Sequence, residues 1–290
     1  MMKSFEEHYH DLITKNADPR TKDWLLVGSP WPIACLCILY LVMVRVGQQM
    51  MIKRPAFSLQ GPMIAYNLFL VLLSAYMLYE FIMSSWLVPG FNFHCAPVDA
   101  SDNPSSLRLA RAVWWYYFSK VIEFADTAFF VLRKKNNQVT ILHLYHHVTM
   151  PFLWYIGTTF APGGEAYFAA SVNCLVHIIM YSYYLLSALG PAVQPYLWWK
   201  KYLTGLQLLQ FTIVMVRAGY AVYTNCSYPL IFQKMLIFYM LSFIVLFSNF
   251  FYQTYFQKKH RSAAVNGVSN GVFHDVKHIR SLDASQCKKD

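Results

Sequence analysis

The sequence is short of charged residues. Asp, Glu, Lys and Arg make up 13% of its 290 residues, whereas about 25% is usual in a soluble domain. Hydrophobic residues make up 57% and aromatic residues 18%. Because so few charges cannot cover a water-exposed surface, the composition argues against a soluble globular protein and indicates one that is embedded in lipid.

The N-terminal region lacks an apolar segment. Residues 1–29 mix polar side chains with the acidic residues Glu6, Glu7, Asp11, Asp18 and Asp23. A secretory signal peptide requires an apolar core of about 7 to 15 residues in such a region. No cleaved leader is therefore expected, and residues 1–30 are predicted to form a segment outside the membrane.

Long apolar stretches dominate the rest of the chain. A helix needs roughly 20 apolar residues to cross the hydrocarbon core of a bilayer. Residues 31–256 are therefore predicted to form an all-α integral membrane domain of about seven transmembrane helices, with six as the alternative count. The apolar stretches are 31–50, 62–83, 111–132, 138–158, 167–189, 203–223 and 231–255.

The net charge is +10, and the distribution of the basic residues along the chain predicts the topology. The basic residues lie mainly in short connections, so no nucleic-acid partner is expected. Lys and Arg concentrate on the cytosolic side of membrane proteins, and here every second connection is basic. This pattern places the N-terminus in the lumen and the C-terminus in the cytosol. The basic residues are Arg45, Lys53, Arg54, Arg133, Lys134, Lys135, Lys200, Lys201, Lys258, Lys259 and Arg261.

Two of the six cysteines, Cys95 and Cys226, lie in connections on the opposite side of the predicted topology. That compartment is oxidising, and a disulfide persists there. A disulfide between Cys95 and Cys226 is therefore predicted, and two unpaired thiols are the alternative.

The C-terminal residues 257–290 contain seven basic residues with several Gly, Ser and Asn. Such a segment cannot bury enough apolar surface to fold, and it is predicted to be a disordered cytosolic tail. Its end, Cys287-Lys288-Lys289-Asp290, resembles a dilysine retrieval signal, although in the usual signal the lysines lie one position further from the end.

Polar side chains share one helical face in each of four successive stretches, because residues three or four positions apart lie on the same face. Such groups are costly in a membrane and usually functional. Hydrogen bonding between helices is the structural alternative, above all for His177, the tyrosines and the glutamines. The stripes are Lys120, Glu123 and Asp126; His143, His146 and His147; Asn173, His177, Tyr181 and Tyr184; and Thr204, Gln207 and Gln210.

The third and fourth stretches form a hairpin, in which residues at equal depth have numbers with a constant sum. Glu123 with His146 and Asp126 with His143 have the same sum, so each carboxylate is predicted to face a histidine. A carboxylate beside an imidazole orients the ring and fixes its tautomer. The two pairs predict a catalytic site inside the membrane.

Three chemistries suit such a site: a metal centre, nucleophilic attack by an imidazole on a thioester, and general base catalysis. Membrane di-iron oxygenases use a related histidine pattern, but they need more histidines than the four in the predicted helices. A single zinc held by three of them stays open. Outside enzymology, a seven-span receptor or transporter is the alternative, although it does not predict four facing polar stripes.

Four motifs resemble one family, the very-long-chain fatty acid elongases, or 3-ketoacyl-CoA synthases, of animals and fungi. The resemblance covers the chain from about Asp18 to Gln257. The motifs are Lys120-Val-Ile-Glu123-Phe-Ala-Asp126-Thr127, His143-Leu-Tyr-His146-His147, His177-Ile-Ile-Met180-Tyr181-Ser-Tyr183-Tyr184 and Thr204-Gly-Leu-Gln207-Leu-Leu-Gln210.

The resemblance implies an enzyme of the endoplasmic reticulum membrane that condenses a long acyl-CoA with malonyl-CoA and needs no cofactor. It implies six helices in a barrel around an acyl tunnel, with a seventh packed outside. Homo-oligomers, or complexes with the ketoacyl reductase, dehydratase and enoyl reductase of the elongation cycle, are expected. Gln138 and Leu142 are similar to the branch that often takes polyunsaturated chains.

Roles for the site residues follow from the register and from the resemblance. His146 is predicted to carry the acyl group, His143 and His147 to act as positioning or base residues, and His177 to assist. Glu123 and Asp126 complete the catalytic set. The candidates for substrate binding, including basic residues for the CoA phosphates, are Lys120, Asn173, Tyr181, Tyr184, Gln207, Gln210, Arg133, Lys134, Lys135, Lys200 and Lys201.

Overall fold

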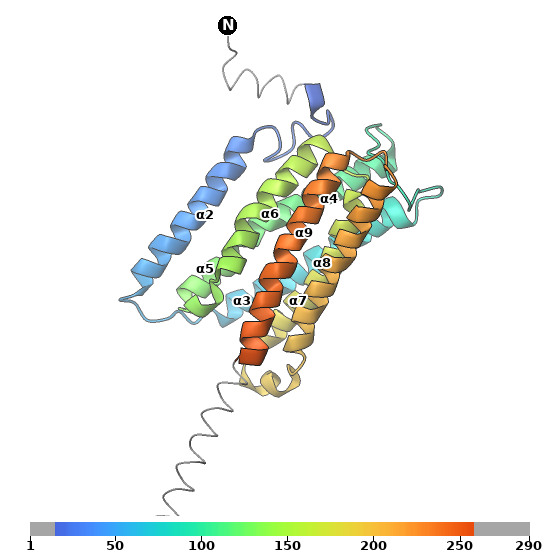
Figure 1. Cartoon of the computed structure of the whole chain (residues 1–290). Coiled ribbons are helices and arrows are strands. Elements are labelled where there is room, and N and C mark those ends of the chain that lie inside the picture. Colours follow the sequence, from blue (N-terminus) through green and yellow to red (C-terminus); the bar gives the residue numbers. More distant parts are fainter. Residues whose placement is uncertain (1–14, 258–290) are drawn as a thin grey trace, which may run out of the picture. The chain divides into compact units, whose positions relative to one another are not determined.

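Helices make up the ordered elements of residues 15–257, the part of the chain that the structure, a computed structural model, describes (Figure 1). No strand occurs within this range. The α-helices are α2 (Pro30–Met51), α3 (Gln60–Phe81), α4 (Pro104–Ile122), α5 (Phe124–Leu132), α6 (Ile141–Phe160), α7 (Ala166–Ala188), α8 (Lys200–Tyr223) and α9 (Leu230–Phe251). Short helical turns are η1 (Ile82–Trp86), η2 (Asn136–Gln138), η3 (Pro191–Tyr196) and η4 (Tyr252–Gln257).

The chain forms two compact units, Met1–Phe243 and Ile244–Asp290. The boundary falls inside α9, and the site described below lies in the first unit. The first 14 residues of the predicted N-terminal segment lie outside the described residues. The same holds for the predicted tail from residue 258 onward, with its Lys288 and Lys289.

Short polar side chains and a proline set the starts of two helices that carry the site. The side chain of Asn103 accepts a hydrogen bond from the amide of Ser105 at 2.8 Å, and Pro104 is the first residue of α4. Thr140 accepts from the amide of His143 at 3.2 Å. Each side chain satisfies an amide that has no partner inside its helix. The Thr140 cap thereby fixes where the histidine-bearing face of α6 begins.

Five helices are long and apolar enough to cross a membrane: α2, α3 with η1, α7, α8, and α9 with η4. The predicted all-α membrane architecture is confirmed at this level. The predicted stretch 111–132 is not a single helix, because α4 and α5 meet at Glu123. Ionisable side chains in α4 and α6 make these helices less apolar, so length and composition do not identify them as spans.

The helices of the first unit contact one another in cyclic order. α3 packs most extensively against α7, and α7 packs against α8. On the other side α3 contacts α4, and α4 contacts α6. α9 joins α6 through a hydrogen bond of 2.9 Å between Tyr145 and Ser242, and it joins α8 through stacked rings of Phe211 and Phe243. α2 lies against α5 and α6 (Figure 1).

The outward faces of these helices are apolar. Ile38 and Leu39 of α2 are 62% and 60% exposed, and Phe238 of α9 is 73% exposed. Apolar exposure on this scale is rare on a soluble monomer. It agrees with helices whose backbone groups are satisfied internally and whose side chains face lipid.

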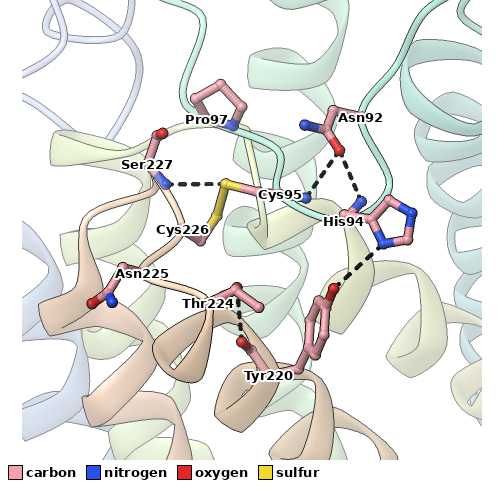
Figure 2. Close-up of a pocket in the computed structure, with 9 residues that line it drawn as sticks. All are labelled: Asn92, His94, Cys95, Pro97, Tyr220, Thr224, Asn225, Cys226 and Ser227. Carbon is pink, nitrogen blue, oxygen red and sulfur yellow. Dashed lines mark hydrogen bonds between the residues drawn. A yellow bond between two sulfur atoms is a disulfide. The ribbon is translucent and has the colours of Figure 1, made fainter.

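One end of the first unit, here called the disulfide end, is fastened by the bond between Cys95 and Cys226, whose Cα atoms are 5.4 Å apart. The predicted disulfide is confirmed. Beside it, the Asn92 side chain accepts from the amides of His94 and Cys95 at 3.0 and 3.2 Å (Figure 2). The Tyr220 hydroxyl of α8 lies 3.4 Å from Nδ1 of His94. The connection before α4 is therefore tied to the end of α8.

An ion pair between the buried Glu165 and the partly exposed Arg217 stabilises the disulfide end. Arg217 donates to both carboxylate oxygens of Glu165, at 2.8 and 3.1 Å, and to the carbonyl of Phe93 at 2.7 Å. The amide of Ala96 also donates to Glu165, at 2.8 Å. The Glu165 side chain is 1% exposed. A buried pair is favourable when its remaining hydrogen-bonding groups are satisfied, and these contacts meet that condition.

The close approach at this end generates a prediction. Gly164 has φ +50°, and a Cβ there would lie 2.7 Å from the carbonyl oxygen of Ala96. Gly164→Ala is expected to lower the free energy of unfolding by about 1–3 kcal/mol. The measurement is the melting temperature in detergent.

Gly157→Ala is the matched control. Gly157 lies in α6, and a Cβ there meets nothing within 4 Å. Because Ala favours a helix over Gly by about 1 kcal/mol, this variant should melt at or above the wild-type temperature. Equal melting temperatures for the two variants would contradict the close approach at Gly164.

Candidate active site

The three histidines of α6 gather on one face of the helix. The ring centroids of His143 and His147 are 4.2 Å apart, and those of His146 and His147 are 5.1 Å apart. His147 is buried, and the ring of His146 lies 5.5 Å from that of Phe243. The structure therefore brings the three predicted histidines together. Among residues 15–257, no group of three or more His, Cys, Asp or Glu is arranged to hold a metal ion.

Glu123 lies at a break between two helices. α4 ends at Ile122 and α5 begins at Phe124, and Glu123 between them has ψ −13°, whereas about −42° is typical of an α-helix. Its amide still donates to the carbonyl of Ser119 at 2.9 Å. The regular helix is therefore interrupted for one residue, at the position that carries the buried carboxylate.

Glu123 is the centre of a buried polar network. The ammonium of Lys120 donates to Glu123 Oε1 at 2.8 Å, and the two side chains are 1% and 3% exposed. Nδ1 of His177 lies 3.4 Å from the same oxygen. Asn173 Oδ1 accepts from Lys120 at 3.3 Å and from the Tyr116 hydroxyl at 2.6 Å. The network joins α4 to α7, and it includes the predicted residues Lys120, Glu123, Asn173 and His177.

The second carboxylate bonds to α7. The Tyr181 hydroxyl donates to Asp126 Oδ2 at 2.8 Å. Tyr181 is buried, whereas Tyr184 is 37% exposed and its ring lies 5.8 Å from that of Tyr181. The structure therefore places Asp126 with Tyr181, and Tyr184 stands at the edge of this group.

The carboxylates bond differently from the predicted register. The register pairs Glu123 with His146 and Asp126 with His143. In the structure Glu123 bonds to Lys120, His177 and Ser119, and Asp126 bonds to Tyr181 and to Tyr66 of α3. Glu123 also interacts electrostatically with His146 and His147, so the carboxylate lies near the histidine cluster although it makes no hydrogen bond to it.

His143 has a hydroxyl partner that sequence reasoning missed. Its Nε2 lies 2.7 Å from Thr127 Oγ1, and Thr127 Oγ1 lies 2.9 Å from the hydroxyl of Tyr40 in α2. Thr127 follows Asp126 directly and ends the first motif, so its position in the sequence could have marked it as a candidate site residue. Tyr40 lies in an apolar stretch and carries no such signal.

The polar residues of α8 differ in their contacts. The amide nitrogen of Gln207 lies 3.6 Å from the sulfur of Met180. Gln210 is 6% exposed, and within the described residues its Oε1 has no hydrogen-bond partner. Buried polar atoms without a partner are uncommon in native proteins, so Gln210 Oε1 is suited to a donor from a ligand.

The predicted basic residues lie at the end opposite the disulfide, but they are not equivalent. The ammonium of Lys134 donates to the carbonyls of Ile52 and Arg54 at 3.2 and 2.9 Å, and so fastens the connection after α2. Lys135, Lys200 and Lys201 are exposed, and Arg133 is partly exposed. The side chains of Lys135, Lys200 and Lys201 are accessible to a charged ligand. The Lys134 ammonium is instead bonded to backbone carbonyls.

Buried ionisable groups held by hydrogen bonds among lipid-facing helices define a polytopic membrane enzyme. Comparison with known families narrows this class. Residues 25–263 match the model of the family described as ELO: GNS1/SUR4 family, a range that includes all four motifs. The chain belongs to the ELO family of fatty acid elongases.

The chain is similar to curated elongases over most of its length. It is 45% identical over 267 residues to very long chain fatty acid elongase 4 of Homo sapiens, with 91% of this chain and 85% of the relative covered. It is 47% identical over 251 residues to very long chain fatty acid elongase 7 of Rattus norvegicus, with 85% and 89% covered. An elongase of Aedes aegypti is 45% identical over 265 residues, with 91% and 74% covered.

The buried network predicts a stability effect. Glu123→Gln would leave the Lys120 ammonium without its counter-charge. It is therefore expected to lower the free energy of unfolding by about 3–5 kcal/mol. Glu80→Gln is the control, because Glu80 also pairs with an arginine, Arg108, at 2.6 Å, but their side chains are 16% and 35% exposed. Because water reaches the Glu80–Arg108 pair, its loss should lower the free energy of unfolding less than the loss of the Lys120–Glu123 pair; fully exposed pairs contribute about 0–1 kcal/mol.

Melting temperatures in detergent compare the two variants. The double variant Lys120→Met/Glu123→Gln should recover part of the loss, because it removes the isolated charge. A Glu123→Gln protein that melts no lower than Glu80→Gln would show that Lys120 does not need this carboxylate.

Proposed function

We propose that this protein condenses a long-chain acyl-CoA with malonyl-CoA to give a 3-ketoacyl-CoA, with release of carbon dioxide and CoA. The observation that carries the proposal is the cluster of three imidazoles on α6 in a membrane domain that also buries the Lys120–Glu123–His177 network. The elongase relatives support the substrate class.

The first half-reaction transfers the acyl group to His146. A ring nitrogen of His146 attacks the thioester carbonyl carbon, the carbon–sulfur bond breaks, and CoA leaves as a thiolate that takes up a proton. The product is an acyl-imidazole. His147, whose ring centroid lies 5.1 Å from that of His146, accepts the proton that His146 releases and passes it to the thiolate, while His143 orients the cluster.

The second half-reaction uses the malonyl unit. Its carboxylate carbon leaves as carbon dioxide, and the electron pair left on the adjacent carbon attacks the acyl carbonyl. The bond to His146 then breaks, and the leaving ring nitrogen takes up a proton from the medium, which restores the imidazole. Glu123 lies 3.4 Å from Nδ1 of His177 and favours the tautomer with hydrogen there. Nε2 of His177 is then available to accept a proton or a hydrogen bond during this step.

The fold supports a matching architecture. We assign α4 with α5, and α6, as further spans, which makes seven in all. The cyclic contacts of α3, α4, α6, α9, α8 and α7 suit a barrel around the acyl chain, with α2 outside it. An amide of the CoA arm would satisfy the unpartnered oxygen of Gln210.

The topology follows from the two ends of the molecule. A disulfide suits the lumen of the endoplasmic reticulum, and the basic connections suit the cytosol. The N-terminus is then lumenal and the C-terminus cytosolic, and Lys135, Lys200 and Lys201 face cytosolic CoA phosphates. The 3-ketoacyl product must be reduced next, which calls for a reductase and the later enzymes of the cycle as partners.

The assay of function uses purified protein in detergent with a long-chain acyl-CoA and labelled malonyl-CoA. A labelled product two carbons longer, and the release of labelled carbon dioxide, are expected. A panel of saturated and polyunsaturated chains would define the preference. Absence of any elongated product across the panel would reject the proposal in favour of a receptor, a transporter or a metal-dependent oxygenase.

The acyl-enzyme is the next prediction. Intact mass after incubation with acyl-CoA alone should show one added acyl group in the wild type, and none in His146→Ala, because an imidazole nitrogen of His146 is the attachment point. Cys174→Ala tests the nearest rival, since Cys174 is a buried free thiol in α7, one residue from Asn173.

The Cys174→Ala protein should be acylated as the wild type is. An adduct that disappears in Cys174→Ala, or that persists in His146→Ala, would show that His146 is not the nucleophile.

His177 is predicted to be essential for turnover. General acid–base catalysis contributes about 10²- to 10⁴-fold, so His177→Ala should lose activity on that scale. The His177→Gln variant retains hydrogen bonding but cannot titrate, and it should be equally inactive. Turnover and melting temperature are to be measured on the same preparation. Near-normal turnover in either variant would show that His177 is a structural residue and is not needed for catalysis.

A further inference from the structure

A chain of two buried hydroxyls runs from α2 to the histidine cluster. The Tyr40 hydroxyl lies 2.9 Å from Thr127 Oγ1, and Thr127 Oγ1 lies 2.7 Å from Nε2 of His143. Tyr40 is 3% exposed and Thr127 is 0% exposed. Three helices, α2, α5 and α6, therefore meet at one imidazole nitrogen, through hydroxyls that solvent does not reach.

The number of hydrogens fixes the direction of this chain. Each hydroxyl donates one hydrogen, so Thr127 donates either to His143 or to Tyr40. If Thr127 donated to Tyr40, the phenolic hydrogen of Tyr40 would be buried without an acceptor among residues 15–257, which is unfavourable. If Tyr40 donates to Thr127 and Thr127 donates to Nε2 of His143, both buried hydroxyl hydrogens have an acceptor.

We infer that Tyr40, acting through Thr127, is a positioning residue that holds His143 in the tautomer with its hydrogen on Nδ1. His143 then accepts at Nε2 and donates at Nδ1, so it acts in the site as a hydrogen-bond donor and not as a base. His143 is partly exposed, and a carbonyl oxygen of a bound thioester is the acceptor that suits this donor. The role in turnover rests on the proposed function, whereas the tautomer does not.

The ring of Tyr40 is held independently of its hydroxyl. It stacks on Phe124 with centroids 4.5 Å apart, and it lies 6.0 Å from the ring of His147. Tyr40→Phe therefore keeps the packing of α2 on α5 and removes one oxygen. α2 stands outside the cyclic contacts of the other helices, and through Tyr40 it contacts residues of the site.

The test measures the tautomer and the kinetics in the full-length protein. Histidine labelled with ¹⁵N reports which ring nitrogen carries the hydrogen, and the His143 signal is identified by its loss in His143→Gln. The wild type should show hydrogen on Nδ1. In Tyr40→Phe, Thr127 is free both to donate to His143 and to accept from it, so the preference for Nδ1 should be lost and a signal for hydrogen on Nε2 should appear. Turnover should fall about tenfold to a hundredfold, with KM little changed.

Matched variants separate positioning from packing. Tyr117→Phe is the control, because Tyr117 is equally buried and its hydroxyl donates to the carbonyl of Leu26 at 3.0 Å. It should keep wild-type turnover and the wild-type His143 signal. Thr127→Ser retains the hydroxyl and should behave like the wild type, whereas Thr127→Val should behave like Tyr40→Phe. The double variant Tyr40→Phe/Thr127→Val should lose no more than either single variant.

Two results would overturn the inference: a wild-type His143 with hydrogen on Nε2, or a Tyr40→Phe protein with wild-type signal and turnover. If Tyr40→Phe does not fold, the wild-type tautomer and the Thr127→Ser and Thr127→Val pair decide the matter. A wild-type protein that forms no condensation product would refute the proposed function, and the ¹⁵N measurement would still decide the tautomer.

Discussion

The buried ion pair between Lys120 and Glu123 governs the arrangement of the site. An ammonium that is 1% exposed among apolar helices requires a counter-charge. Glu123 provides it, and the free hydrogen-bonding capacity of the pair then requires further partners. Asn173 and His177 supply them from α7. The approach of α4 to α7 at this depth is therefore dictated by polar satisfaction as well as by apolar packing.

Several interactions at the disulfide end hold the helices of the first unit in place. At the disulfide end, the Cys95–Cys226 bond and the Glu165–Arg217 pair tie connections to helix ends. At the same end Arg20 pairs with Asp18 at 2.7 Å, and the amide of Asp18 donates to the carbonyl of Thr159 at 2.8 Å, next to the end of α6. Helices fastened there keep a fixed orientation further along, which is what preorganised electrostatic catalysis requires.

The sequence predicts the apolar helices and the composition of the site better than it predicts the contacts. Length and hydrophobicity suffice for α2, α3, α7, α8 and α9, and the spacing of His143, His146 and His147 suffices for their cluster. The break at Glu123 has no local signal, because no Pro or Gly lies in the motif from Lys120 to Thr127. A pairing rule based on straight helices brings Glu123 near His146 but does not reveal the hydrogen bonds of the carboxylates to Lys120 and Tyr181.

The contribution of α2 shows why such contacts escape sequence reasoning. A tyrosine among apolar residues of a predicted span is an ordinary lipid-interface or core residue, and Tyr40 differs only in what lies against it. Its partner Thr127 lies in α5 and contacts side chains of both α2 and α6. In the proposed mechanism the ionisable residues of the motifs provide the chemistry, and in the inferred chain neutral hydroxyls on neighbouring helices set the direction of the hydrogen bond to His143. Those hydroxyls become visible only when the packing is known.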